Sequence, residues 1–214
     1  MMDFVALAQH CAPTVHPLTM AAVVRVESGF NPLAIGVVGG RLERQPLSKE
    51  EAVATVKALA SAGYNFSLGV GQINRYNLPK YGWDFETAFD PCPNLRAGGS
   101  ILSDCFSRAQ GRYRDPQQAL QAAFSCYYSG NFSTGFRADF AGQLSYVQKV
   151  VGSAGVMATP NKVAPIRLIR SMRQGPATAL RKTDPYRVTV EANGEGLAPP
   201  AVYGGTIDPV MVFR

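Results

Sequence analysis

Apolar residues recur at helical spacing along most of the first 150 positions of the chain. The clearest example is the stretch 17–28, in which one helical face carries residues at i, i+3, i+4 and i+7. The residues on this face are Met20, Val23, Val24 and Glu27. Pro17 suits the first turn of a helix, and Gly29 is a typical residue just after its end. The pattern therefore predicts a helix whose apolar stripe includes a carboxylate in the last turn.

Other segments show the same periodicity or similar start and stop signals. The predicted helices span about 2–10, 48–62, 91–110, 116–129 and 139–151. Gly98 and Gly99 should allow a close helix contact in the third of these. Strand patterns are weak over residues 1–150, and glycines interrupt the stretch 66–83, which we expect to be irregular. The fold class predicted for residues 1–151 is therefore a mainly α domain with one irregular loop.

Residues 152–214 have a different character. They are rich in Gly, Pro, Ala and basic residues, and they lack a periodic core pattern long enough to fold alone. Between Asn161 and Thr183 there are six basic residues and no acidic one. The segment YRVTVEA (186–192) alternates like a strand. We expect this part of the chain to be a largely disordered basic tail.

The composition is ordinary for a globular protein of 214 residues, with 46% hydrophobic and 17% charged positions. No apolar run approaches the roughly 20 residues that span a bilayer, so we expect no transmembrane segment. The first residues, MMDFVALAQHC, lack the basic region of a secretory signal. An exported protein with this sequence would start upstream, be trimmed, or use another export route.

The net charge of +6 is concentrated in the tail, where residues 151–214 carry 8 Lys or Arg and 4 Asp or Glu. A modestly basic chain suits an anionic polymer or a membrane surface as its partner. Aromatic and basic residues do not interleave as they do in proteins that bind single-stranded nucleic acid. We therefore expect no nucleic-acid partner.

The four cysteines are compatible with two disulfides in an oxidising compartment. Cys92 and Cys105 stand at either end of 13 residues of predicted helix, which rise about 20 Å. Bridged Cα atoms lie only roughly 4.4–6.8 Å apart, so this pair is excluded. Two pairings remain: Cys105–Cys126 with Cys11–Cys92, or Cys11–Cys105 with Cys92–Cys126. We favour the first, because Cys105 and Cys126 lie on helices joined by a short turn; four reduced cysteines are the alternative.

Glu27 is the candidate for acid–base chemistry. Apolar neighbours and the negative end of a helix dipole both oppose ionisation, so both raise the pKa of a carboxyl at this position. A carboxyl that stays protonated near neutral pH can act as a general acid. The alternative is a structural glutamate that is satisfied by a hydrogen bond or turned toward solvent.

Three motifs occur in order along the chain: Glu27-Ser28 at a helix end, GVGQIN (69–74) and CYYSGN (126–131). Together they resemble the soluble lytic transglycosylase family, which has a lysozyme-like fold of the goose type. The stretches NPLAIGVVGG, NRYNLPKYG and FDPCPNLRAGGSIL are similar to one subgroup, the specialised transglycosylases of VirB-type type IV secretion systems. The resemblance covers roughly residues 4–150.

The resemblance implies a role for each matching residue. Glu27 would be the catalytic acid and base, and Ser28 would position it or the acetamido group of the substrate. Tyr127 would form a hydrogen bond near Glu27. The sugar cleft would be lined by the loop residues Gly69, Gly71, Gln72 and Ile73, with Gln72 contacting substrate. Tyr128 stands where the family usually has Asn, and Gly71 where it has a bulkier apolar residue.

The same resemblance implies cleavage of the bond between N-acetylmuramic acid and N-acetylglucosamine in peptidoglycan, with formation of a 1,6-anhydro product. Such an enzyme works in the periplasm with a single carboxylate, no cofactor and no metal, and its partners are glycan strands and other secretion components, the latter through the tail. Glu43 is the one accessory carboxylate that we retain. Phe66, Tyr76 and Tyr81 are candidates for stacking on sugars. A lysozyme-type hydrolase and a non-catalytic peptidoglycan-binding scaffold are the alternatives.

Overall fold

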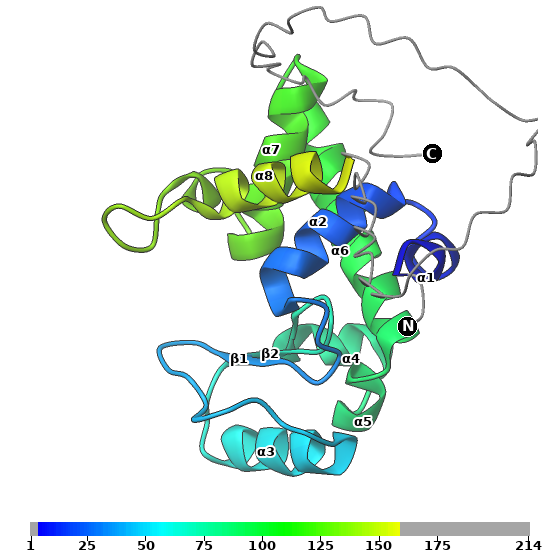
Figure 1. The fold of residues 1–214 in the computed structure, drawn as a ribbon, viewed down its shortest axis with the longest axis vertical. Coiled ribbons are helices and arrows are strands. Elements are labelled where there is room, and N and C mark those ends of the chain that lie inside the picture. The colour runs from blue at the N-terminus through cyan, green and yellow to red at the C-terminus, as the bar shows by residue number, and fades with distance from the viewer. Residues whose placement is uncertain (1–3, 159–214) are drawn as a thin grey trace, which may run out of the picture. The chain divides into compact units, whose positions relative to one another are not determined.

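The protein is described here by a computed structural model of residues 4–158 (Figure 1). The larger helices are α1 (Phe4–Cys11), α2 (Pro17–Ser28), α3 (Lys49–Ser61), α6 (Pro91–Gln110), α7 (Pro116–Ser129) and α8 (Tyr146–Ala158). The short helical turns are η1 (Arg75–Asn77), α4 (Leu78–Tyr81), α5 (Phe85–Ala88) and η2 (Thr134–Phe136). The strands are β1 (Ile35–Val37), β2 (Phe66–Leu68) and β3 (Ile73–Asn74). The mainly α fold class predicted from the sequence is confirmed.

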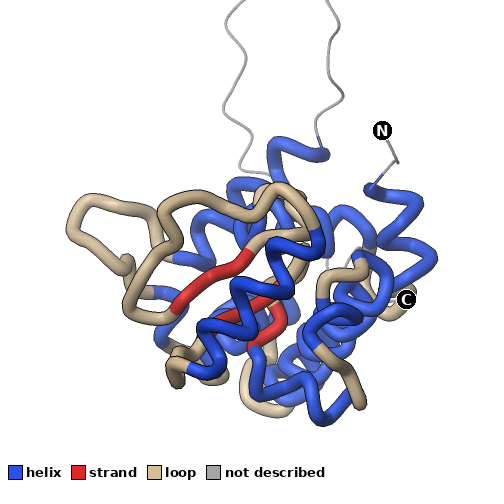
Figure 2. Tube along the Cα trace, turned by 90° about the horizontal axis from the view of Figure 1, so that it is seen from below, coloured by secondary structure: helices blue, strands red, loops and turns tan. Residues whose placement is uncertain are grey.

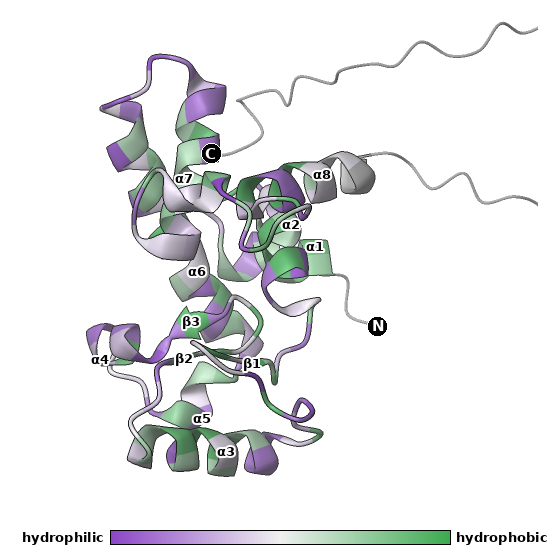
Figure 3. Cartoon of the chain, turned by 90° about the vertical axis from the view of Figure 1, so that its left-hand side faces the viewer, coloured by the Kyte–Doolittle hydropathy of each residue, from purple (hydrophilic) through white to green (hydrophobic). Residues whose placement is uncertain are grey.

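One hydrophobic core lies among α1, α2, α6, α7 and α8, and a second joins the sheet to α3, α4, α5 and α6 (Figure 3). The long helix α6 contributes to both cores, with Leu95 and Leu102 in the first and Ala97 in the second. Gly99 allows the chain after α1 to approach closely, since a Cβ at this position would lie 2.9 Å from the Cβ of Ala12. The helix contact predicted for Gly98 and Gly99 is made by Gly98, where a Cβ would lie 2.9 Å from Oη of Tyr127 on α7 and 3.1 Å from Cε of Met20 on α2.

The strands form a small antiparallel sheet in the order β1-β2-β3. Ile35 pairs with Leu68, and Leu68 pairs in turn with Ile73. Seen from below, α3 crosses in front of this sheet (Figure 2). The expectation that residues 66–83 are irregular is wrong in part, because this stretch contains β2, β3, η1 and α4. Strands of two or three residues are too short to give an alternating pattern that the sequence could reveal.

The last helix differs from its prediction at both ends. It begins at Tyr146 rather than near 139, and it continues to Ala158 rather than 151. The residues before it form a loop in which Phe140 and Leu144, which fall within the helix predicted over 139–151, are exposed. Residues 159–214 lie outside the described part of the chain, so the tail and the strand-like segment 186–192 stay predictions. Within residues 4–158 no helix combines the length and the apolar character needed to cross a bilayer.

Two disulfides join the helices of the first core. Cys11 pairs with Cys92, with their Cα atoms 5.1 Å apart, and this bond links the end of α1 to the first turn of α6. Cys105 pairs with Cys126, with a Cα–Cα distance of 5.8 Å, and links α6 to α7. This is the pairing that the sequence analysis favours, and α6 takes part in both bonds.

We expect the Cys11–Cys92 bond to contribute more stability than the Cys105–Cys126 bond, because it closes the longer loop. The sequence separations are 81 and 21 residues. Loop-closure entropy then gives about 4–5 kcal/mol for the first bond and about 3 kcal/mol for the second. Guanidinium denaturation of the Cys11→Ala/Cys92→Ala and Cys105→Ala/Cys126→Ala variants would measure both losses. Equal losses, or the reverse order, would contradict this entropic account.

Candidate active site

A cavity of about 640 Å³ lies between the helical core and the sheet. Its walls come from the ends of α2 and α7, from the three strands, and from the loop after β1. Among its lining residues, all within the described part of the chain, Glu27 is the only carboxylate and Arg41 the only Lys or Arg. The structure thus places a single acidic group in an otherwise nearly neutral cleft.

Glu27 lies in the last turn of α2, one residue before the helix ends. Gly29 closes the helix in the left-handed conformation, with φ 60°, and donates its N–H to the carbonyl of Arg25. Glu27 is half-buried: one side borders the cleft, and protein atoms surround the rest. Loss of hydration raises the pKa of Glu27 from 4.5 to about 7, and a hydrogen bond from Tyr146 opposes this effect. The carboxyl can therefore exist in both protonation states near neutral pH.

Tyr146 is the contact of Glu27 that the sequence analysis missed. Its hydroxyl donates to Oε1 of Glu27 at 2.5 Å, and burial holds the pKa of Tyr146 well above its usual value. Tyr146 is the first residue of α8, and a reciprocal cap fixes this helix start. The N–H of Ser145 donates to Oε1 of Gln148, and the N–H of Gln148 donates to Oγ of Ser145. The Ser-x-x-Gln signature of this capping box is the sequence signal that marks the start of α8 at Tyr146.

The loop 69–72 is held through its backbone by side chains from three helices. Ser28 Oγ donates to the carbonyl of Val70 at 2.7 Å, and Tyr127 Oη donates to the carbonyl of Gly71 at 2.6 Å. Asn94 Oδ1 accepts the N–H of Gly71 at 2.7 Å. Ser28 and Tyr127 were expected to act on Glu27 or on the substrate. In the structure their hydroxyls bind the loop instead, although Tyr127 also borders the cleft.

Asn94 is a second residue that the sequence analysis missed. Its side chain is fully buried, and Nδ2 donates to the carbonyls of Leu68 and Ala88 at 2.9 and 2.8 Å. The position of Asn94 also explains why residues 69 and 71 of the loop are glycines. A Cβ on Gly69 would lie 2.4 Å from Nδ2 of Asn94, and one on Gly71 would lie 3.1 Å from its Oδ1. A side chain at position 71 would therefore crowd Asn94. Its Cβ would also lie 3.2 Å from the hydroxyl oxygen of Tyr127.

Gln72 and Ile73 continue the loop into β3, and both border the cleft. Gln72 has a positive φ of 51°, and its Nε2 donates to the carbonyls of Ala34 and Gly69. Its Oε1 lies over Gly36, where a Cβ would come within 2.6 Å. Ile73 is almost fully buried in the second core, so most of its side chain serves packing.

Tyr128 borders the cleft next to these groups and is 41% exposed. Its ring stacks on the ring of Tyr146, with centroids 4.6 Å apart and planes inclined by 16°. Its hydroxyl donates to Oδ1 of Asp139 at 2.8 Å. Tyr128, Tyr146 and Glu27 thus form a connected series of contacts.

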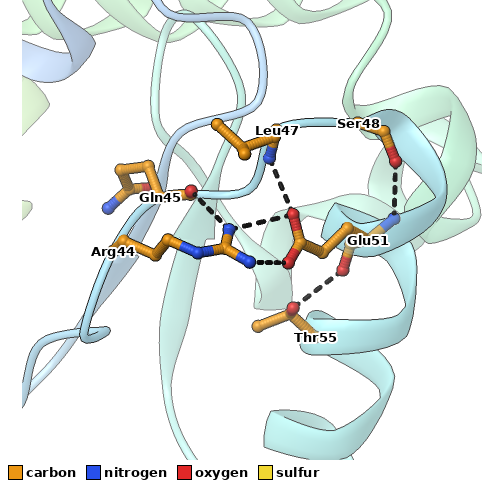
Figure 4. A network of polar contacts seen from close by, with 6 residues as sticks. All are labelled: Arg44, Gln45, Leu47, Ser48, Glu51 and Thr55. Carbon is orange, nitrogen blue, oxygen red and sulfur yellow. Dashed lines mark hydrogen bonds and ion pairs between the residues drawn. The ribbon is translucent and has the colours of Figure 1, made fainter.

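The loop after β1 is fastened at two places. The side-chain amide of Gln45 exchanges two hydrogen bonds with the backbone of Ile35, and so acts like a further strand residue. Arg44 binds both carboxylate oxygens of Glu51 on α3 (Figure 4). Glu43, the accessory carboxylate retained from the sequence, does not line the cleft but borders a smaller pocket beside Arg44.

Comparisons with known proteins agree with one another. The family described as "Transglycosylase SLT domain" matches residues 4–141. The type IV secretion system protein virB1 of Brucella suis biovar 1 (strain 1330) is 56% identical over 187 residues, which are 86% of this chain and 78% of that protein. The protein virB1 of Agrobacterium fabrum (strain C58) is 32% identical over 166 residues, covering 76% and 64% of the two chains. No solved structure matches the chain significantly.

The raised pKa of Glu27 should make the protein less stable as the pH rises from 4.5 to about 7. In this window the unfolded state releases the proton first, whereas below it both states are protonated. Glu27→Gln removes this titration, so the stability of the variant relative to the parent should grow across the window by at most about 3 kcal/mol. Denaturant unfolding at pH values on both sides of the window measures this gain. A difference that does not change with pH would contradict the raised pKa.

Removing the hydroxyl of Tyr146 should raise the pKa of Glu27 further, because the hydrogen bond stabilises the carboxylate. An NMR titration of the Glu27 side-chain carboxyl in Tyr146→Phe should therefore show a higher midpoint than in the parent. Tyr64→Phe, at an exposed position that does not line the cleft, is the matched control and should leave the midpoint unchanged. An unchanged or lowered midpoint in Tyr146→Phe would refute this role.

Proposed function

The chain belongs to the transglycosylase SLT family, and we propose on that premise that Glu27 is its catalytic acid and base. The observation that carries the proposal is the position of Glu27. It is the only carboxylate among the described residues that line the cleft, and burial raises its pKa to about 7. A group with this pKa can donate a proton and then accept one at neutral pH.

The proposed substrate is the β-1,4 bond between N-acetylmuramic acid and N-acetylglucosamine in peptidoglycan. Neutral Glu27 gives its proton to the bridging oxygen, and the bond from that oxygen to C1 of the muramic acid breaks. The acetamido group of the substrate stabilises the positive charge that develops at C1, as in substrate-assisted glycosidases. The ionised Glu27 then takes the proton of the C6 hydroxyl while O6 bonds to C1. The products are a 1,6-anhydro sugar and a free N-acetylglucosamine end, and Glu27 regains its proton.

The lack of a second acid in the cleft supports a transglycosylase over a typical hydrolase. Most glycosidases need a second carboxylate, as a nucleophile or as a base that activates water. In the cleft of residues 4–158 the other polar groups are amides, hydroxyls and the guanidinium of Arg41. An intramolecular attack by the C6 hydroxyl needs only the group that has just lost its proton.

The contacts that hold Glu27 and the end of its helix in place fit the same proposal. Tyr146 holds the carboxyl from one side, while Ser28 ties the end of α2 to the loop that carries Gln72. Gln72 and Ile73, which border the cleft, are the proposed contacts of the glycan, whereas Gly69 and Gly71, predicted to line it, do not border it. Ser28, Gly69 and Gly71 are proposed to keep the loop in position.

We further propose that the enzyme opens the cell wall locally for a type IV secretion system. The support is the 56% identity to a relative named as a type IV secretion system protein, over 86% of this chain. With peptidoglycan as the substrate, the proposed place of action is the periplasm. Other secretion components are the proposed protein partners.

Glu27→Gln should abolish the formation of 1,6-anhydro products while the protein stays folded. A general acid contributes about 100-fold or more to the rate, and this variant loses both the acid and the base. Mass spectrometry of the fragments released from purified peptidoglycan is the measurement, and Glu43→Gln is the control carboxylate outside the cleft.

The product masses separate the alternatives. Fragments that gain the mass of water would indicate a hydrolase, and tight binding without any fragments would indicate a scaffold. Full activity of Glu27→Gln would remove the proposed mechanism.

A further inference from the structure

We propose that Tyr128 is a stacking platform for a pyranose ring of the bound glycan, next to the bond that is cleaved. This inference rests on the proposed function, because it takes the glycan strand as the occupant of the cleft. It assigns to Tyr128 a specific contact, made by the face of its ring rather than by its hydroxyl.

One face of the Tyr128 ring is covered, and the residue is otherwise partly open. One face is covered by the nearly parallel ring of Tyr146, at a centroid distance of 4.6 Å. The side chain nevertheless stays 41% exposed, and it lines the cleft together with Glu27. The structure therefore presents an aromatic surface to the cleft and backs it with a second ring.

The ring is also fixed in orientation before any ligand arrives. Its hydroxyl donates to Asp139 at 2.8 Å, which holds the outer end of the side chain. Its inner face rests on Tyr146, whose own hydroxyl is bound to Glu27. Only one residue thus separates the platform from the acid, and a sugar stacked on Tyr128 would lie beside the reacting carboxyl. A surface fixed in advance loses little entropy on binding.

A pyranose ring has the complementary chemistry. Its axial C–H bonds form an apolar patch with a small positive charge, and an aromatic face is both apolar and negative. The phenol hydroxyl remains at the wet edge of the contact, as is usual for tyrosine at interfaces.

The other aromatic candidates are less suited to this role. Phe66 is fully buried, and Tyr81 is half-buried and stacks on Trp83. Tyr76 is exposed but does not line the cleft. Among the aromatic residues of the described chain, only Tyr127 and Tyr128 line it, and Tyr127 is held against the loop by its bond to Gly71.

The test measures binding without turnover, in the Glu27→Gln background. The probe is a peptide-free hexasaccharide of alternating N-acetylglucosamine and N-acetylmuramic acid, and calorimetry gives its Kd. We expect Tyr128→Ala to weaken binding about tenfold and Tyr128→Phe to stay within about threefold of the parent. Tyr64→Ala removes an exposed tyrosine outside the cleft and should leave the Kd unchanged.

A second readout separates stacking from a merely structural effect. Sugar protons that lie over an aromatic ring shift upfield in the NMR spectrum. This shift should be present in the parent and in Tyr128→Phe, because both keep the ring, and it should be absent in Tyr128→Ala. An unchanged Kd in Tyr128→Ala, or an equal loss in Tyr128→Phe, would overturn the platform.

The Tyr128 proposal and the catalytic proposal can fail separately. If Glu27→Gln still releases anhydro fragments from peptidoglycan, the catalytic mechanism fails, but the platform stands if the Tyr128 variants change hexasaccharide binding, measured before appreciable turnover, as expected. If the Glu27→Gln parent does not bind the hexasaccharide at all, the glycan is not the occupant of the cleft, and the platform is refuted with it.

Discussion

The site depends on one contact between two helices that are distant in sequence, the hydrogen bond from Tyr146 on α8 to Glu27 on α2. Burial alone would push Glu27 strongly toward its neutral form. The hydrogen bond from Tyr146 stabilises the carboxylate and lowers its pKa, so Glu27 can still ionise. The balance between these opposing effects keeps the pKa of Glu27 at about 7.

This balance depends on the end of α2 at Ser28, directly after Glu27. Gly29 stops the helix in the left-handed conformation, immediately after the Glu-Ser pair. The two side chains then have separate tasks. Glu27 borders the cleft, and Ser28 donates to the carbonyl of Val70, which ties the helix end to the loop 69–72. Tyr127 and Asn94 hold the same loop from α7 and α6.

The helices and the acid were predictable from the sequence, whereas several of the contacts around the acid were not. Glu27 stood out because a carboxylate on an apolar stripe conflicts with its neighbours. Tyr146 went unnoticed because the apolar residues Phe140 and Leu144 extended the predicted helix over a loop, although the capping box at 145–148 marked the true start. Asn94 carries no periodic signal, and its role follows from tertiary contacts, two of which join it to Gly71 and Leu68, 23 and 26 residues earlier in the chain. The short strands were missed because two or three residues cannot establish an alternation.

The two disulfides have a consequence beyond holding helices together. Cys126 directly precedes Tyr127, and Cys92 lies two residues before Asn94, so each covalent bond anchors the backbone next to a residue that clamps the loop. Maturation of the site is therefore coupled to thiol oxidation. Under reducing conditions the chain would lack both anchors, so the cleft would acquire its final rigidity only where thiols are oxidised.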